Sequence, residues 1–261
     1  MKPQVLLTFD LEEFDLPLEF SCPVSVDDQI EISNEGLKRL TGILTARNIP
    51  ATFFTTSFYA GKNQVLMKEL SANHEIASHS KYHSSFSEGD MAESRIELQK
   101  ITGQEIRGFR MPRFSAASLL NIKEAGYSYD SSLNPTFIPG RYNKLSSPRL
   151  YYTDNESRLA ELPVSVSPVM RFPLFWLSFK NLPFAIYLNM CRRVMRKDSY
   201  LHLYFHPWEF ADLASLDIPR YIKRLSGNAL AERFEKLLAA LEEEGEFSTV
   251  SDFLRKSGLV I

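Results

Sequence analysis

The sequence is poor in cysteine and histidine, and it has almost no excess charge of either sign. Its 261 residues include two cysteines and five histidines, and 30 basic against 32 acidic side chains give a formal net charge of -2. Two cysteines cannot build a disulfide framework or a thiolate zinc site. We therefore expect Cys22 and Cys191 to be small buried hydrophobic residues in a reducing compartment. The near-zero charge argues against a protein that binds nucleic acid mainly through phosphates.

Long hydrophobic runs and targeting signals are also missing. Near the start, residues 5–7 are the only apolar run, and they are too short for the core of a signal peptide. The most apolar region, residues 169–191, is interrupted by Arg171 and Lys180, so it is too short to span a membrane. A helix packed on the core is favoured there over a helix at a membrane surface, which is the alternative. The expected location is the cytoplasm.

Short apolar runs alternate with longer amphipathic stretches along the chain. Seven segments are predicted to be strands because they are short and rich in β-branched, aromatic or alternating residues: 5–9, 51–56, 75–78, 106–109, 161–166, 200–205 and 247–250. This alternation predicts an α/β fold, a distorted (β/α) barrel with about seven strands, in which residues 1–261 form one domain. The proline-rich stretch 134–157 is interpreted as a long surface loop rather than a domain linker.

The first predicted strand runs into three carboxylates, those of Asp10, Glu12 and Glu13. Alternation of side chains places Thr8 and Asp10 on one face, so Asp10 lies at the carboxyl end of the strand. Active residues of α/β barrels lie at that end. Taken alone, a strand that enters a solvated acidic loop is the more common explanation of such a motif.

Three of the five histidines lie within residues 74–83. His79 and His83 are four residues apart, a spacing that would bring two imidazoles onto one face of a helical turn, as a divalent metal requires. Solvated surface histidines are the alternative. His74 lies at the opposite end of the preceding strand and is interpreted as structural.

Two further strand ends present an arginine and a histidine. Arg110 follows the fourth predicted strand, where its guanidinium can orient a carboxylate through a bidentate contact, although a basic surface loop also fits. Pro207 ends the sixth predicted strand and leaves His206 at its tip. His202 lies deeper on the same strand face and is predicted to be a hydrogen-bonded core histidine.

Together these motifs resemble those of the polysaccharide deacetylase family, also called the NodB-homology or carbohydrate esterase 4 type. The resemblance extends from Thr8 to His206 and follows the order Thr-Phe-Asp, His-Ser-x-x-His, Arg-x-Pro and a last strand that ends in histidine. The ending His-Pro-Trp-Glu at residues 206–209, with the stretch 126–132, resembles the bacterial subgroup associated with exopolysaccharide and capsule synthesis.

The resemblance implies metal-dependent hydrolysis of N-acetyl or O-acetyl groups on a polysaccharide or its sugar precursor. By similarity, His79 and His83 would bind a divalent metal, most often zinc in this family, which would activate a water molecule. Asp10 would be the general base, Arg110 would hold Asp10 in position, and His206 would protonate the departing amine.

The sequence departs from the family pattern at two places. Leu11 stands where the family has a second aspartate, and leucine cannot coordinate a metal. Some relatives carry Asp-x-Asp or Asp-x-Glu here, so the resemblance implies Glu12 as the third ligand, with Glu13 in reserve, and a weak or absent metal site stays open. Arg113 and Phe114 replace the usual aromatic residue and glycine, so we expect a different cleft shape and substrate.

Three more residues are candidates for contact with a carbohydrate. Trp208 is predicted either to offer a flat face to a sugar or to be a buried residue at a strand end. Tyr82 is predicted to lie in the cleft or to pack nearby. Asp130 resembles a family position near the arginine and histidine, or is a turn aspartate. Glu161, in a stretch that resembles a subgroup feature, is a weaker candidate.

Two other functions stay open from the sequence. One is a related metal-dependent hydrolase that acts on a small amide or cyclic imide. The other, suggested by Leu11, is a catalytically silent carbohydrate-binding protein. The expected partners are a carbohydrate and no nucleic acid, and nothing in the sequence indicates the oligomeric state.

Overall fold

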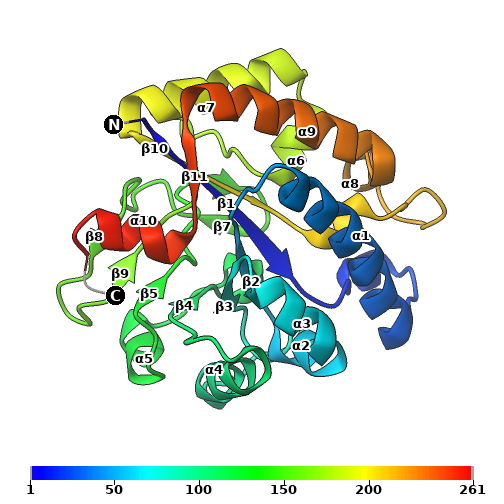
Figure 1. Ribbon diagram of the computed structural model, residues 1–261, viewed down its shortest axis with the longest axis horizontal. Helices are drawn as coiled ribbons and strands as arrows, with labels where there is room; N and C mark the ends of the chain where they lie inside the picture. Colours follow the sequence, from blue (N-terminus) through cyan, green and yellow to red (C-terminus); the bar gives the residue numbers. More distant parts are fainter. Residues whose placement is uncertain (1, 260–261) are drawn as a thin grey trace.

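The computed structural model describes residues 2–259, which form a curled, mainly parallel β-sheet surrounded by helices (Figure 1). Its strands follow the order β10-β1-β2-β3-β4-β5-β9-β8, with β11 also paired to β1. Only β8 runs antiparallel to its neighbour. The strands are β1 (Gln4–Leu11), β2 (Thr52–Thr55), β3 (Glu75–Ser78), β4 (Gly108–Phe109), β5 (Tyr129–Asp130), β8 (Tyr152–Thr153), β9 (Ala160–Glu161), β10 (Tyr200–Phe205) and β11 (Glu246–Ser248). This curled sheet confirms the predicted α/β, barrel-like fold class.

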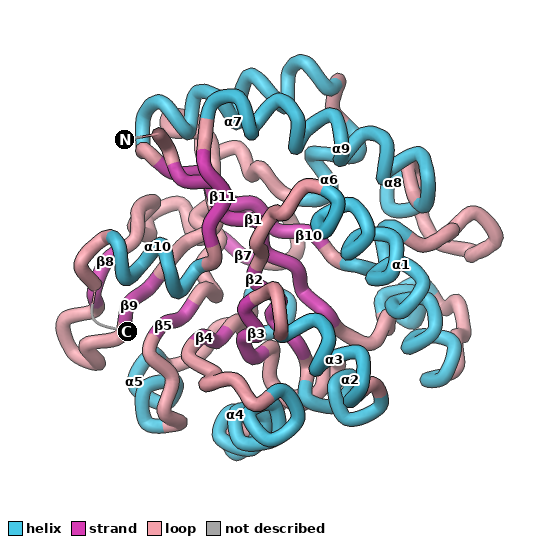
Figure 2. The backbone as a smooth tube through the Cα atoms, viewed as in Figure 1, coloured by secondary structure: helices cyan, strands magenta, loops and turns pink. Residues whose placement is uncertain are grey.

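Helices connect the parallel strands and cover the outside of the sheet (Figure 2). The longest is α1, where the Ser25 side chain accepts a hydrogen bond from the backbone of Asp28 at the start of the helix. Among the described residues, no helix is both long and apolar enough to cross a membrane. The helices are α1 (Val26–Ala46), α2 (Ser57–Lys62), α3 (Gln64–Ser71), α4 (Gly89–Thr102), α5 (Leu119–Glu124), α6 (Trp176–Asn181), α7 (Phe184–Asp198), α8 (Arg220–Lys223), α9 (Gly227–Glu244) and α10 (Val250–Lys256).

β1 is the central strand, and its two faces differ in chemistry. Leu7 and Phe9 belong to the cluster packed against the outer helices, whereas Thr8 and Asp10 face the inside of the curled sheet. β10 pairs along one side of β1, while β11 and β2 share the other side. Strands from both ends of the chain therefore meet at β1, and their carboxyl ends lie at the same edge of the sheet. This pairing supports the single-domain prediction, which stays a prediction.

All seven predicted strand segments overlap an observed strand, and two of them, β3 and β10, match to the residue. The fifth overlaps β9 only at Glu161, because the chain after it continues as an extended segment. That segment bonds β10 through the Ser165 amide and the His202 carbonyl, 2.9 Å apart. The sequence pattern missed β5, which has two residues. The proline-rich stretch is not wholly irregular, since it holds β8 and the hairpin of β6 (Phe137–Ile138) and β7 (Tyr142–Asn143).

Candidate metal and active site

Asp10 and Arg110 form a buried ion pair at the carboxyl ends of β1 and β4. The Arg110 Nη1 donates to Asp10 Oδ1 over 2.6 Å, and Nη2 donates to the hydroxyls of Thr8 (3.1 Å) and Ser131 (3.0 Å). Burial alone would raise the pKa of Asp10, but the charges of Arg110, His79 and His206 together lower it. Asp10 is therefore an ionised carboxylate in a fixed orientation at neutral pH.

Glu12 returns to the same side of the chain as Asp10, because it follows by two residues, while Leu11 is buried in the outer core. Glu12 Oε2 lies 3.2 Å from His79 Nε2 and 3.3 Å from His83 Nε2. This oxygen is buried and has no hydrogen-bond partner. The three ligand atoms lie within 4.8 Å of one another, a spacing that suits one metal ion.

The outer nitrogens of both histidines are held by oxygen atoms. His79 Nδ1 lies 2.8 Å from the carbonyl oxygen of Arg110, and His83 Nδ1 lies 2.6 Å from Asp15 Oδ1. When Nδ1 carries the proton in each ring, the Nε2 lone pairs both point toward Glu12. Two imidazole nitrogens and a carboxylate oxygen, with no donor between them, fit a divalent cation such as Zn²⁺.

Acidic neighbours also bias His83 toward binding a positive charge. Burial would lower its pKa, but the charge of Glu12 and the hydrogen bond with Asp15 raise it to about 9. A metal ion would compete with that proton, so we expect metal affinity to fall as pH decreases.

The route to this convergence differs from the prediction. His79 and His83 do not lie on a helical turn but in a loop after β3, so that part of the interpretation is wrong. Ser80 between them has φ 64°, in the left-handed region, and the two imidazole rings stack with centroids 5.8 Å apart. Glu13 holds this loop, because its two oxygens accept hydrogen bonds from the His83 amide and the Thr56 hydroxyl, both at 2.8 Å. Glu13, the alternative third ligand, therefore uses both of its oxygens in these hydrogen bonds.

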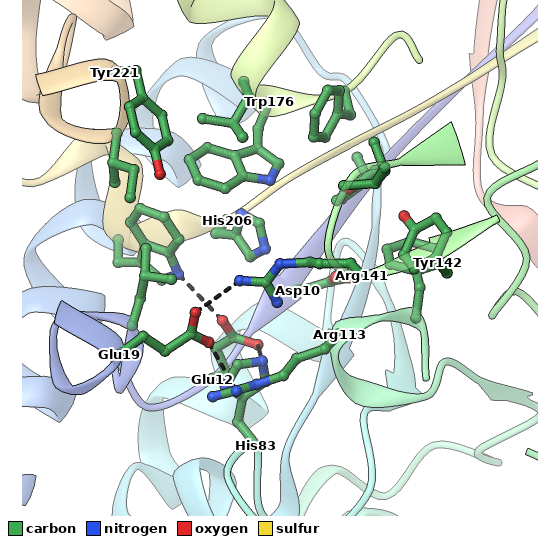
Figure 3. A pocket seen from close by; sticks show the side chains of 18 of the residues that line it. Asp10, Glu12, Glu19, His83, Arg113, Arg141, Tyr142, Trp176, His206 and Tyr221 are labelled. Atoms are coloured by element: carbon green, nitrogen blue, oxygen red, sulfur yellow. Dashed lines mark hydrogen bonds and ion pairs between the residues drawn. The ribbon is translucent and has the colours of Figure 1, made fainter. Parts of the chain in front are cut away.

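His206 lies at the tip of β10, between Trp176 and the carboxylates of Asp10 and Glu12 (Figure 3). Its Nδ1 is 3.2 Å from Glu209 Oε1, which also accepts a hydrogen bond from the His206 amide at 2.8 Å. Burial would lower the pKa of His206, yet the bond to Glu209 and the nearby carboxylate charges raise it. The imidazole is therefore anchored on one side and biased toward its protonated form.

Glu209 is itself supported by Lys180, whose Nζ lies 3.2 Å from Glu209 Oε2. Both side chains are fully buried. Burial alone would raise the pKa of Glu209, but the charge of Lys180 lowers it. Lys180 thus keeps Glu209 ionised behind His206.

The site opens into a pocket of about 270 Å³. The metal-site residues and His206 line its inner part, and Figure 3 shows the aromatic and basic side chains around them. The outer part of the lining includes Glu19, Arg113, Arg141, Tyr142, Trp176 and Tyr221. Arg113 donates to Asp15 (3.0 Å) and pairs with Glu19 (2.8 Å).

Trp208 and Tyr82, two of the predicted carbohydrate contacts, both pack against other rings, and of the two only Trp208 lines the site pocket. Trp208 is buried, Phe14 and His206 stack on it, and its Nε1 donates to Glu12 Oε1 over 3.3 Å. Its indole therefore supports Glu12, the candidate metal ligand. The rings of Phe14 and His206 pack against the indole where a sugar would stack. Tyr82 packs on Phe58 with ring centroids 5.2 Å apart and lines a different surface hollow.

Asp130 and Glu161 face one another on β5 and β9, and neither lines the site pocket. Asp130 accepts hydrogen bonds from the amide and hydroxyl of Ser132, at 3.0 and 2.6 Å. Burial raises the pKa of both carboxyls, and the charge of Asp130 raises that of Glu161 further. The structure does not bring them together with the metal-site residues.

The two remaining histidines have structural contacts. His202 is buried with Nε2 at 3.2 Å from the Thr8 hydroxyl, and burial lowers its pKa to about 3. The Arg110 Nη2 lies 3.1 Å from the same nitrogen. His74 packs edge-on against Phe53, and burial lowers its pKa to about 4. Both are neutral at neutral pH, as core histidines are.

The sequence interpretation missed Asp15 and the pair of Lys180 with Glu209. Two signals were present. Asp15 closes the acidic stretch that begins at Asp10, and Lys180 is an isolated charge within an apolar region, a pattern typical of a buried, paired cation. The segment 172–176 was interpreted as core, with a lid or acceptor surface as the alternative, and its Trp176 lines the pocket.

Comparisons with known proteins agree with this geometry. Residues 2–129 match the family model for polysaccharide deacetylase, and residues 131–255 match a domain of unknown function, DUF3473. Residues 2–129 are therefore similar to the polysaccharide deacetylase family. None of the curated proteins matches the chain.

Solved structures share the fold at low sequence identity. A protein assigned as a polysaccharide deacetylase from Mycobacterium smegmatis is 21% identical, with a TM-score of 0.65 over 99% of this chain and 92% of that one. One from Pseudomonas aeruginosa PAO1 is 15% identical, with a TM-score of 0.66 over 97% and 89%. BA3943 from Bacillus anthracis, described as a CE4 family pseudoenzyme, is 15% identical, with a TM-score of 0.50 over 97% and 66%.

Proposed function

We propose that the protein is a metal-dependent hydrolase that removes acetyl groups from N-acetylated sugars of a polysaccharide or its precursor. The observation that supports it most is the convergence of Glu12, His79 and His83 beside Asp10 and His206 in one pocket. Hydrolysis of an amide needs an electrophile, a base and an acid around one carbonyl group, and these residues supply a place for each.

When bound at Glu12, His79 and His83, a divalent cation supplies a Lewis acid that polarises the acetyl carbonyl and activates water. The two imidazoles and the carboxylate favour Zn²⁺. Asp10 accepts the proton of the attacking water, since its lowered pKa keeps it ionised at neutral pH. Arg110 holds Asp10 in place and neutralises the buried charge.

His206 acts as the general acid toward the leaving nitrogen. Glu209 occupies its Nδ1 side, which leaves Nε2 for the substrate. The raised pKa increases the protonated fraction near neutral pH, the form that donates a proton to the departing amine. The pocket volume and the half-buried Trp176 suit one sugar ring, because flat aromatic faces pack well against sugars.

A second candidate is a catalytically silent carbohydrate-binding protein. Leu11 favours it, because this side chain occupies the position of the family's second aspartate and lies in the core. We also propose that the protein belongs to the subgroup associated with exopolysaccharide and capsule synthesis. The His-Pro-Trp-Glu motif at residues 206–209 supports this assignment.

Acetate release and metal content test the proposed function together. We expect about one Zn²⁺ per chain and release of acetate from N-acetylglucosamine oligomers that stops after chelation and returns when Zn²⁺ is added. Bound Zn²⁺ and bound sugar without acetate release would favour the silent protein. Absence of both metal and acetate release from every oligomer would refute the proposal.

A further inference from the structure

A second groove adjoins the site pocket, and its lining is largely apolar. Phe175, Leu177 and Tyr221 line both the pocket and the groove, so the two hollows lie side by side. Figure 3 shows Tyr221 beyond Trp176, on the side of the pocket away from His83. The groove has a volume of about 610 Å³, ample for a flexible chain.

Large apolar side chains from separate segments are exposed around this groove. Met170 is 82% exposed, Phe137 and Tyr221 are each 51% exposed, and Leu145 is 44% exposed. These residues come from the loop before α6, from β6, from α8 and from the turn after β7. Single exposed apolar residues are common, but several that gather around one hollow beside a catalytic pocket mark a binding site.

A positive charge lies next to the apolar lining. Arg141 extends from the β6–β7 hairpin, the same hairpin that contributes Phe137, and lines the site pocket. Its side chain is 45% exposed, and its ion-pair partner is Glu19 at 2.7 Å, a carboxylate that also binds Arg113. The site pocket therefore contains a half-exposed guanidinium, and the groove that adjoins this pocket is apolar.

We propose that this groove binds the hydrocarbon chain of a glycolipid substrate. The acetylated sugar would then lie in the site pocket, and an anionic linkage between sugar and chain would meet Arg141. This inference rests on the proposed function, because the polar end of the ligand is the sugar that the site acts on. The groove adjoins the site pocket, and the charge of Arg141 suits an anionic linkage. Both features favour a substrate chain over a membrane surface or a second copy of the protein.

The test compares N-acetylglucosamine carrying a methyl or an octyl group at the anomeric oxygen, both kept below micelle-forming concentrations. We expect the KM for acetate release to be about tenfold lower for the octyl glycoside, the gain that burial of about two methylene groups gives. The kcat should be unchanged. For an octyl phosphodiester of the same sugar, we expect a further decrease in KM. Arg141→Ala should abolish this further decrease. Equal KM values for the methyl and octyl glycosides would overturn the proposal.

Two adjacent residues give a matched pair of variants. Met170 lines the groove, whereas its neighbour Val169 is 91% exposed and does not line it. We expect Met170→Ser to remove most of the octyl advantage and Val169→Ser to leave it unchanged, with the methyl glycoside unaffected in both. Since both side chains project into solvent, neither change should disturb folding. An equal effect of the two variants would contradict the proposal.

Direct binding separates this inference from the proposed function. Calorimetry on the unmodified protein should show tighter binding of the octyl than of the methyl glycoside, and Met170→Ser should abolish the difference, whether or not acetate is released. Binding to phosphatidylglycerol vesicles without any chain-length effect on sugar binding would instead assign the surface to a membrane. A dimer in sedimentation that Met170→Ser dissociates, again without a chain-length effect, would assign it to a second copy. Either result would overturn the glycolipid proposal.

Discussion

The two segments matched by family models contribute unlike parts to one pocket. Residues 2–129 provide the ion pair of Asp10 and Arg110 and the whole candidate metal site. Residues 131–255 provide His206 with its support and much of the outer wall, including Arg141, Trp176 and Tyr221. The first segment therefore holds the groups that would bind and activate, and the second holds the acid and the surfaces that would select a substrate.

The difference extends to how firmly the side chains are held. The polar groups of the first segment are buried, and most have several hydrogen bonds, as Arg110 does. The outer wall of the second segment is partly exposed, with Arg141 and Tyr221 about half in solvent. Fixed geometry suits the reacting groups, while an exposed wall can change without disturbing them. Variants in the two segments should thus separate metal binding from proton donation and from substrate preference.

The largest effect is expected from the loss of the third metal ligand. Glu12→Ala removes the carboxylate that lies within 3.3 Å of both His79 and His83, so bound Zn²⁺ should be lost and acetate release should fall by about a thousandfold or more. Metal analysis after dialysis and an acetate assay measure both. Glu13→Gln is the matched control and should keep its metal, because Glu13 binds the His83 amide and Thr56. A Glu12→Ala protein that retains Zn²⁺ would exclude Glu12 as a ligand.

Loss of the acid should leave the metal site intact. His206→Asn is expected to lower kcat by roughly a hundredfold to ten-thousandfold, the usual range for a general acid, with little change in metal content. Steady-state kinetics and metal analysis on the same preparation test this. If His206→Asn also releases the metal, the division of labour between the two segments is wrong.

A smaller effect is expected behind His83. Asp15→Asn replaces the carboxylate that orients this ring, and it should weaken Zn²⁺ binding by about tenfold to a hundredfold, as outer partners of metal ligands do. Competition with a chelator gives the affinity. Asp252→Asn, a change at an exposed surface aspartate, is the control. Unchanged Zn²⁺ affinity in Asp15→Asn would show that His83 needs no such support.

The smallest effect is a displacement of the pH profile. His206 donates a proton only below its pKa, and Glu209 raises that pKa, so activity should decline as pH rises through it. The double change Glu209→Gln with Lys180→Met removes the raising group without leaving a buried lysine unpaired. We expect the alkaline limb of kcat/KM to move to lower pH and the acid limb to stay in place. An unmoved alkaline limb would assign that titration to another group.

The sequence predicted the residues that follow simple periodic rules. Alternation along β1 placed Thr8 and Asp10 on one face, and the structure has this arrangement. Glu12 was predicted from the family resemblance, and it lies beside the two histidines. His79 and His83 were predicted as a pair from their spacing, yet the loop that joins them is not helical. A left-handed residue such as Ser80 has no clear signature in the sequence, because several residue types adopt that conformation in turns.

Other features depend on contacts between distant segments. Lys180 and Glu209 meet only when the fold is complete. The sequence around each residue contains no pattern that predicts the other as its partner. β5 has two residues and owes its existence to its neighbours β4 and β9, so a local pattern could not reveal it. Trp208 is a further case, since a tryptophan at a strand end suits both a sugar-binding wall and a buried support.

The central position of β1 has a consequence for synthesis of the protein. β1 is translated before its partners, because Gln4 pairs with Tyr200 and Glu246, which emerge nearly 200 and more than 240 residues later. At about 5 to 20 residues per second, the strand waits roughly 10 to 40 seconds for β10. During that interval the unpaired edge of β1 is apolar and can pair with other unfinished chains. We therefore expect ribosome-associated chaperones to be needed most at β1. A chain released before residue 206 would contain the candidate metal ligands but not His206, the proposed acid. We therefore expect such a truncated protein to be inactive.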